Sequence, residues 1–352
     1  MNKDTTKFVG IDLGDKTSLV YVIDQAGEFV KETRLPTTAT ALEREFGGQA
    51  LLRIALEVGA HSRWVSRELS GYGHEVVVAN ASKLRLIYEN PRKSDRVDAE
   101  YLARLMRLDV SLLAPITHRG EAAQQHLAVL RSRDSLVRAR TQLVNHVRGT
   151  AKSFGVRLPQ CATEYFARKA RPELPDSLRP ALEPVLDSIQ DLSERIRAYD
   201  QEIERLCDAV YPETQALRSI KGVGAWTALA FVLTLEDPQR FRKSREVGPY
   251  LGLAPKRNQS GDEDPERNIS KRGDKFLRRL LVGSAQYILG PFGQDSQLRR
   301  WGLQLAGEGS KAAKKRAVVA VARKLSVLLH KLWVSGETYQ PFYPLRQEAG
   351  LA

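Results

Sequence analysis

The chain has 352 residues, with 55 lysines and arginines against 42 acids, a formal charge of +13 and a pI near 9.7. This length allows two or three domains, and the positive charge favours a polyanionic partner, with nucleic acid ahead of a membrane surface. The chain has only two cysteines, which argues against a disulfide framework. It shows no apolar leader and no apolar run long enough to cross a bilayer, which argues against secretion and membrane insertion. These features predict a cytoplasmic protein.

The N-terminal third of the chain predicts an α/β module. Its expected elements, in order, are three strands within 7–33, a helix over 40–47, a strand over 53–57, a helix over 62–70, a strand over 74–79 and a helix after Ser94. A meander followed by βα units is the order of the ribonuclease-H-like fold, a mixed sheet with helices on both faces. In that fold the first strand is central and the strand 53–57 pairs beside it.

Four acids stand out in this module. Asp12 lies in the apolar run FVGIDLG and Glu57 ends the run RIALE, where an unpaired carboxylate is costly to bury. Asp95 and Asp98 are three residues apart, so on a helix they share a face, about 5–6 Å apart. If the four meet at one edge of the sheet, their repulsion requires protons or cations. We therefore predict a Mg²⁺ site, with Mn²⁺ as a substitute, able to serve phosphodiester chemistry.

The middle of the chain predicts long helices. Residues 121–150 form a helical segment with basic polar faces that include Arg131 and Arg138. Apolar residues then recur with a 3-4 spacing at Leu182, Val185, Ile189, Leu192, Ile196, Tyr199, Ile203, Leu206 and Val210. This spacing is the a/d seam of a coiled coil. Pairing with 121–150, pairing with a second copy, or both would bury the seam.

The C-terminal part combines glycine turns with basic helices. Ile220 to Gly224, followed by an apolar helix, resembles the hairpin of a helix-hairpin-helix element, in which glycines let backbone N–H groups approach a phosphate. Helices are expected over 276–289 and 310–334, the latter basic and amphipathic. The expected nucleic-acid contacts are Lys221, Gly222, Gly224, Arg267, Lys271, Arg272, Arg279, Arg131 and Arg138. The four tryptophans could stack on bases, but we expect them in cores.

Ser260 is a candidate nucleophile in this part of the chain. It precedes a glycine in the loop NQSG, and basic residues follow it. A serine beside cations could attack a phosphodiester whose charge is neutralised, although an ordinary turn would also suit a serine there.

These motifs together resemble the DEDD-type insertion-sequence transposases, a family that includes the Piv-type DNA invertases. GIDLGDK, the LE of IALEVGAHSRW and SDRVDAEYLARL are similar to the family's DEDD motif. GVGAWTA, FRKSREVGPYLGLAP, the SG after Gln259 and ISKRGDKFLRRLLV are similar to its serine-bearing domain. The resemblance extends over roughly residues 7–290, with the motifs in the family's order.

The resemblance implies a fold and a mechanism. It implies a RuvC-like domain over 1–115, a helical coiled-coil region over 116–215 and a mainly helical serine domain over 216–352. Asp12, Glu57, Asp95 and Asp98 would hold Mg²⁺, and Ser260 would attack DNA to form a transient 5′-phosphoserine. The implied partners are donor and target duplex DNA, a structured non-coding guide RNA called a bridge RNA, and further copies of the chain, as a dimer or tetramer.

The chain departs from the family at one point. Family members continue the serine motif with a second glycine and a basic residue, whereas here Asp262, Glu263 and Asp264 follow Gly261. These acids could ligate metal, act as a base or form a solvated loop that points away.

The sequence is also compatible in part with three other functions. A hydrolytic nuclease or junction resolvase would use the four acids alone. An actin-like ATPase also opens with GIDLG, but it needs a later Asp-x-Gly-Gly phosphate loop, which this sequence lacks. A non-catalytic nucleic-acid scaffold would not require all four acids and a serine.

Overall fold

The computed structural model describes residues 6–80, 83, 94–256 and 268–342 and divides into two compact units, Met1–His118 and Arg119–Ala352. The predicted boundary at 115/116 lies close to this division, while the predicted boundary at 215/216 falls within the second unit and stays a prediction. No helix among the described residues is long and apolar enough to cross a lipid bilayer.

The first unit is built on a five-stranded mixed sheet with the order β3-β2-β1-β4-β5. Its strands are β1 (Lys7–Asp12), β2 (Thr17–Ile23), β3 (Phe29–Pro36), β4 (Leu52–Glu57) and β5 (Glu75–Ala79). The first three are antiparallel neighbours, and β4 and β5 run parallel to β1. The central place of β1 and its pairing with β4 confirm the arrangement expected from the sequence.

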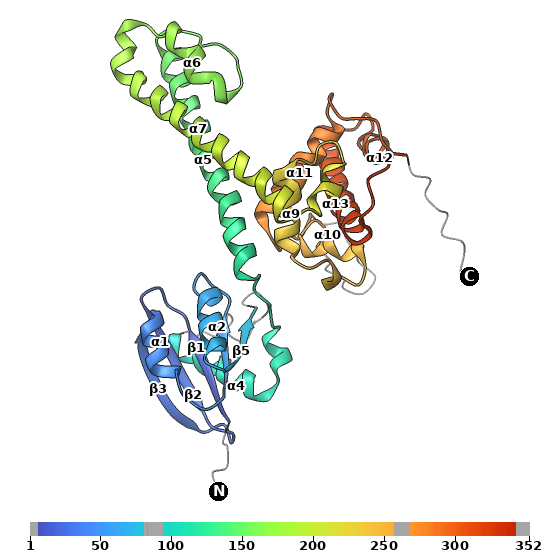
Figure 1. Cartoon of the computed structure of the whole chain (residues 1–352). Helices are drawn as coiled ribbons and strands as arrows, with labels where there is room; N and C mark the ends of the chain where they lie inside the picture. Colours follow the sequence, from blue (N-terminus) through green and yellow to red (C-terminus); the bar gives the residue numbers. More distant parts are fainter. Residues whose placement is uncertain (1–5, 81–82, 84–93, 257–267, 343–352) are drawn as a thin grey trace, which may run out of the picture. The chain divides into compact units, whose positions relative to one another are not determined.

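Helices cover both faces of this sheet (Figure 1). They are α1 (Ala39–Phe46), α2 (Ser62–Gly71) and α4 (Asp95–Leu108). Because strand side chains alternate between faces, Val9 and Ile11 of β1 join the core that includes residues of α1 and α2, whereas Phe8 joins the core under α4. The structure therefore confirms the expected α/β module, a mixed sheet with helices on both faces.

The second unit is helical. Its helices are α5 (Glu121–Ser153), α6 (Phe166–Ala170), α7 (Arg179–Ala209), α8 (Thr214–Arg218), α9 (Ala225–Leu235), α10 (Val247–Tyr250), α11 (Lys275–Leu289), α12 (Gln297–Ala306) and α13 (Lys311–Ser335). All but one of the residues of α9 are buried, so this helix is the centre of the core that the C-terminal helices share. The basic helix predicted over 310–334 is α13, which also buries one face in this core.

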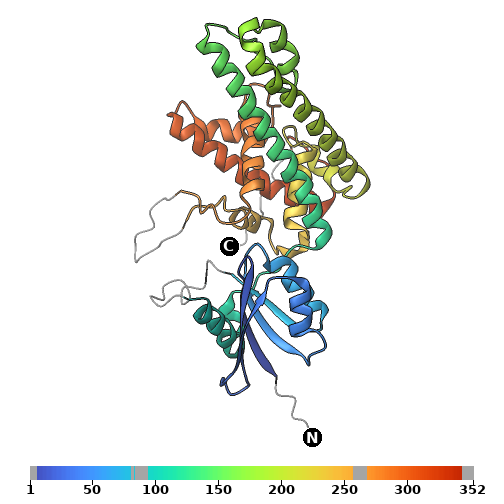
Figure 2. The ribbon, with the colours of Figure 1, turned by 90° about the vertical axis from the view of Figure 1, so that its left-hand side faces the viewer.

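The long helices α5 and α7 pack against each other as a hairpin within one chain, side by side in both views (Figure 1; Figure 2). The predicted seam is buried at Leu182, Ile189, Ile196, Ile203 and Leu206. Val185 is half-buried and packs against the same core, beside the fully buried Leu186, which the seam did not include. One seam position was wrong, because Val210 lies beyond the end of α7 with 44% of its surface exposed. Pairing with 121–150 is therefore confirmed, and pairing with a second copy stays a prediction.

Candidate functional site

Asp12 and Glu57 end two neighbouring parallel strands. In the pairing of β1 with β4, Ile11 lies opposite Leu56, so the next residue of each strand is an acid. Phe8 and Ala55 face the core under α4, and side chains two or four residues along a strand share a face. Asp12 and Glu57 therefore lie at the same end and on the same face of the sheet, both half-buried.

The start of α4 reaches this same end of β1. Ser94 caps the helix, its Oγ accepting a hydrogen bond from the Val97 N–H at 3.3 Å, as its sequence predicted. A Cβ added to Gly10 would lie 1.9 Å from the Ala99 carbonyl oxygen, so the helix backbone touches β1 where β1 has no side chain. Asp98 immediately precedes this contact and is only 8% exposed, on the sheet-facing side of α4.

Asp95 also lies near the end of β1, but its side chain is at the surface. Its Oδ2 is 3.5 Å from Arg34 Nη2, and 59% of its side chain is exposed. Arg34 pairs with Leu19 across β2 and β3, and Leu19 pairs with Asp12, which puts the ion pair level with the end of β1. Of the four predicted acids, the fold brings Asp12, Glu57 and Asp98 to one face, while Asp95 contacts β3.

Carboxylate oxygens, such as those at this end of the sheet, are the hard ligands that Mg²⁺ prefers. Within the described ranges, however, no group of three or more His, Cys, Asp or Glu side chains is arranged closely enough to hold a metal ion. The elements thus meet as the sequence predicted, and the metal centre itself stays a prediction.

The predicted glycine hairpin lies between α8 and α9. Gly222 has φ +102°, a backbone conformation that favours glycine, and the Ile220 carbonyl accepts a hydrogen bond from the Val223 N–H at 2.9 Å. A Cβ added to Gly222 would also lie 2.9 Å from Tyr287 Cδ1 of α11. Gly224 then precedes the first turn of α9. Gly222 therefore holds a position that favours glycine, whereas Gly224, with φ −87° and open space at its Cβ position, does not require one.

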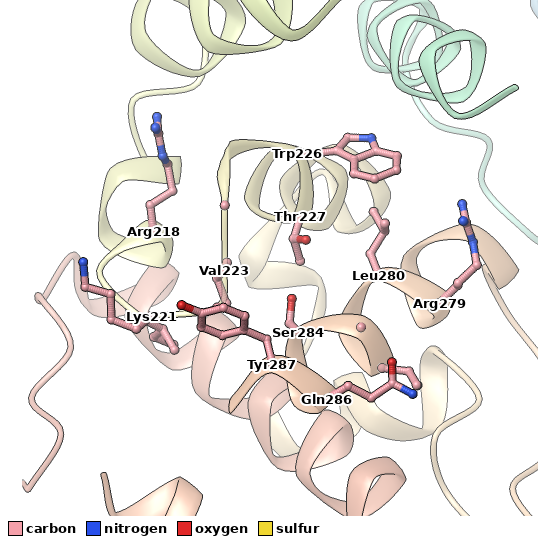
Figure 3. Close-up of a pocket in the computed structure, with 15 residues that line it drawn as sticks. Arg218, Lys221, Val223, Trp226, Thr227, Arg279, Leu280, Ser284, Gln286 and Tyr287 are labelled. Atoms are coloured by element: carbon pink, nitrogen blue, oxygen red, sulfur yellow. The ribbon is translucent and has the colours of Figure 1, made fainter. Parts of the chain in front are cut away.

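An open pocket of about 850 Å³ lies over this hairpin (Figure 3). Lys221, Arg218 and Arg279 contribute its cationic groups, and the hydroxyl groups of Thr227 and Ser284 lie deep in it. Four lining residues were not predicted as contacts from the sequence, namely Arg218, Thr227, Ser284 and Tyr287. Helical spacing gives a signal for two of them, because Ser284 and Tyr287 are three residues apart on one face of α11.

Several arginines predicted to bind nucleic acid take part in ion pairs. Asp134 of α5 is 2% exposed and pairs with Arg138 at 2.8 Å and Arg279 at 2.7 Å. Asp274, which caps α11, pairs with Arg131 at 3.2 Å. Arg131 and Arg279 thus join α5 to the start of α11. Half of the Arg279 side chain stays exposed in the pocket, so its role as a nucleic-acid contact remains open as a prediction.

Ser260 and Arg267, with Asp262, Glu263 and Asp264, lie outside the described residues. The structure does describe the base of their loop. Pro255 and Ile269 form an antiparallel bridge, and the Lys256 N–H donates to the Asn268 carbonyl at 3.0 Å. The described residues that flank 257–267 are therefore held together by backbone pairing.

Lys271 and Arg272 follow this base. Lys271 has φ +55°, and its N–H donates to the Gly252 carbonyl at 3.1 Å. A Cβ added to Gly252, at φ +70°, would lie 1.9 Å from the Arg272 carbonyl oxygen. The two basic residues are thus fixed through their backbones against the GPYLGLAP segment.

Comparisons with known proteins assign the chain to a family. A family model described as "Transposase", named for the DEDD transposases of IS110, matches residues 9–155, and one described as "Transposase IS116/IS110/IS902 family" matches residues 214–297. The first range contains all four acids, and the second contains the glycine hairpin and Ser260.

Named relatives agree with the family models. A Sinorhizobium fredii protein named as a transposase, y4pF/y4sB, is 30% identical over 82% of this chain and 74% of its own length. The transposase for insertion sequence element IS1111A of Coxiella burnetii is 26% identical over 95% of this chain and 91% of its own length. The pilin gene-inverting protein of Moraxella lacunata is 28% identical over 40% of this chain and 43% of its own length. The chain therefore belongs to the IS116/IS110/IS902 family of insertion-sequence transposases.

Proposed function

We propose that this transposase cuts and rejoins DNA strands with a Mg²⁺-binding carboxylate centre and a serine nucleophile, Ser260. The observation that carries the proposal is that Asp12, Glu57 and Asp98 share one end and one face of the first unit. Carboxylate oxygens brought together from β1, β4 and α4 are the hard ligands that Mg²⁺ prefers. The match of the second family model across residues 214–297 supports the serine as the other half of the machinery.

The proposed chemistry conserves the phosphodiester bond. The Ser260 Oγ attacks the scissile phosphorus, the bond from phosphorus to the 3′ oxygen breaks, and the serine proton passes in net terms to that departing oxygen. A 5′-phosphoserine and a free 3′-hydroxyl result. Attack by the 3′-hydroxyl of another strand then reverses the step, joins new ends and restores the serine hydroxyl, so strand exchange needs no ATP.

The carboxylates prepare the substrate for this step. Asp12, Glu57 and Asp98, with Asp95 at the surface, would hold Mg²⁺, which when bound offsets charge on the phosphate and stabilises the leaving oxygen. Without a cation the same side chains would repel the DNA backbone, so metal binding and DNA binding at this end should be linked.

Nucleic-acid recognition would fall to the glycine hairpin and its pocket. Lys221 lines the pocket beside a turn that exposes backbone next to the start of α9, an arrangement suited to a phosphate. We further propose that donor and target duplexes are selected by a structured guide RNA and that two to four copies of the chain assemble around them. The net charge of +13 favours contact with more than one nucleic acid.

The test is a covalent adduct. The purified chain is incubated with Mg²⁺, the non-coding transcript from beside its gene and a labelled donor duplex, and denaturing gels are read for a protein–DNA band. Ser260→Ala should abolish the band and recombination together. Asp12→Asn should abolish both while duplex binding through the basic residues of the second unit largely survives. Ser270→Ala, which changes a serine just past the same loop, should leave the band and recombination intact. Normal recombination by Ser260→Ala would refute the covalent step.

A hydrolytic nuclease is the second candidate. One observation favours it, namely that the carboxylate end is built entirely within the first unit, from β1, β4 and α4. If Ser260→Ala cleaves DNA in Mg²⁺ as well as the parent chain does, and neither forms an adduct, this function replaces the first.

A further inference from the structure

A second basic pocket lies in the C-terminal unit, separate from the glycine hairpin. It has a volume of about 430 Å³ and is lined by residues of α12, α13 and the segment before the serine loop. Its principal lining residues are Arg245, Pro249, Ala254, Trp301, Arg323 and Lys324. The pocket therefore combines three cationic side chains with one indole ring.

The charge of this pocket is unbalanced. Within the described ranges its lining contains no acidic side chain, and the ion pairs found there include none of Arg245, Arg323 and Lys324. The other pocket differs in this respect, because its Arg218 pairs with Glu204 at 2.8 Å and its Arg279 pairs with Asp134 at 2.7 Å. Cations gathered without a counter-ion destabilise one another unless an anion joins them.

Two of these cations are held in place by packing. Lys324 Nζ lies 4.1 Å from the centre of the Trp301 ring, and burial lowers the pKa of its ammonium group. The stem of Arg323 crosses Gly248, where an added Cβ would lie 2.9 Å from its Cγ. Because glycine leaves this space, the arginine stem can lie against the backbone, which limits the positions of its guanidinium group.

The pocket adjoins the base of the loop that carries Ser260. Ala254 lines the pocket, and its carbonyl accepts a hydrogen bond from the Ser270 N–H at 2.8 Å, beside the bridge between Pro255 and Ile269. A strand held in the pocket would therefore lie where the chain enters and leaves the loop.

We infer that this pocket binds the phosphodiester backbone of a nucleic-acid strand that runs to the serine loop, with Arg245, Arg323 and Lys324 on phosphates and Trp301 as the wall beside a sugar or base. The inference rests on the proposed function only in taking nucleic acid as the substrate. Arginine and lysine contacts to phosphate with an aromatic surface beside them are the elements of a strand-binding groove. The pocket is thus a binding site for the strand and contributes no group to the chemical step.

The test compares two adjacent pairs of residues on the same helix. Arg323→Gln with Lys324→Gln removes two cations from the pocket, and Lys315→Gln with Arg316→Gln removes the same two residue types, equally exposed, from a part of α13 outside the pocket. Full-length variants are titrated by fluorescence anisotropy with labelled single-stranded DNA, duplex DNA and a hairpin RNA over a range of salt. We expect the pocket pair to weaken binding about tenfold and to reduce the salt slope by about 2, one per lost phosphate contact.

The outcomes separate the possibilities. The inference holds if the pocket pair loses affinity selectively for at least one probe, and that probe identifies the strand. Arg245→Gln, on a different segment, should weaken binding to the same probe. Equal losses for the two pairs would indicate general charge attraction and overturn the inference, as would no loss with any probe. These are binding measurements, so the absence of an adduct at Ser260 would refute the proposed chemistry without changing this result.

Discussion

Gly10→Ala tests whether the contact between α4 and β1 builds the carboxylate end. The added Cβ would lie 1.9 Å from the Ala99 carbonyl oxygen and 2.7 Å from the Ala103 nitrogen, and both are backbone atoms. Since real Cβ atoms do not approach other atoms closer than 3.0 Å, β1 and α4 must move apart by about 1.1 Å or more at this contact. Forced overpacking of this kind costs about 1–3 kcal/mol. The separation would also carry Asp98 away from Asp12.

The assay is hydrogen–deuterium exchange followed by mass spectrometry. Peptides from β1 and α4 should exchange roughly 5- to 150-fold faster in Gly10→Ala, because the free energy of local opening would be lower by about 1–3 kcal/mol. Metal-dependent DNA cleavage should fall in the same variant. The control is Gly71→Ala in the same unit, where an added Cβ meets no atom within 4 Å. If Gly10→Ala matches Gly71→Ala in both exchange and cleavage, the contact does not position the acids.

Three further predictions concern the second unit. Gly149→Ala, within α5 and with open space around its Cβ position, should raise the free energy of unfolding by about 0.5–1 kcal/mol in urea titrations. Burial raises the pKa of the Cys207 thiol, so at neutral pH a thiol reagent should label the half-buried Cys161 first and Cys207 only on unfolding; rapid labelling of both would contradict the packing. Asp134→Asn should speed amide exchange at the start of α11, because it weakens the ion pair between α5 and Arg279.

The sequence predicts the first unit well because its signals are local. Alternating apolar residues mark the strands, and Ser94 before Asp95 marks the start of α4, where the hydroxyl caps the helix as expected. The meeting of Asp12 and Glu57 followed from the fold class. The ion pair of Asp95 with Arg34 did not, because it depends on the register of β3 against β2, which no local pattern encodes.

The second unit shows where sequence reasoning fails. Three arginines predicted to contact nucleic acid also form ion pairs that no local pattern encodes, Arg138 and Arg279 with the buried Asp134 and Arg131 with the half-buried Asp274. Arg131 and Asp274 are 143 residues apart, and only the packed structure brings them together. The helix α12 was not expected, because arginines interrupt the few apolar residues of QLRRWGLQLA. Trp301 of α12 and the cations of α13 line a pocket together. Helical periodicity alone does not predict this pocket.

The base of the α5–α7 hairpin belongs to the C-terminal core. Leu127 and Leu130 of α5 and Ile203 and Leu206 of α7 share one cluster with the helices that follow, whereas the tip of the hairpin has a separate core. The two long helices, which pack against each other along the hairpin, therefore link the core at the tip to the core around α9. Because α9 begins at the glycine hairpin, the base of the α5–α7 hairpin and the turn at Gly222 are supported by one shared core, so packing changes at that base would act on the turn directly.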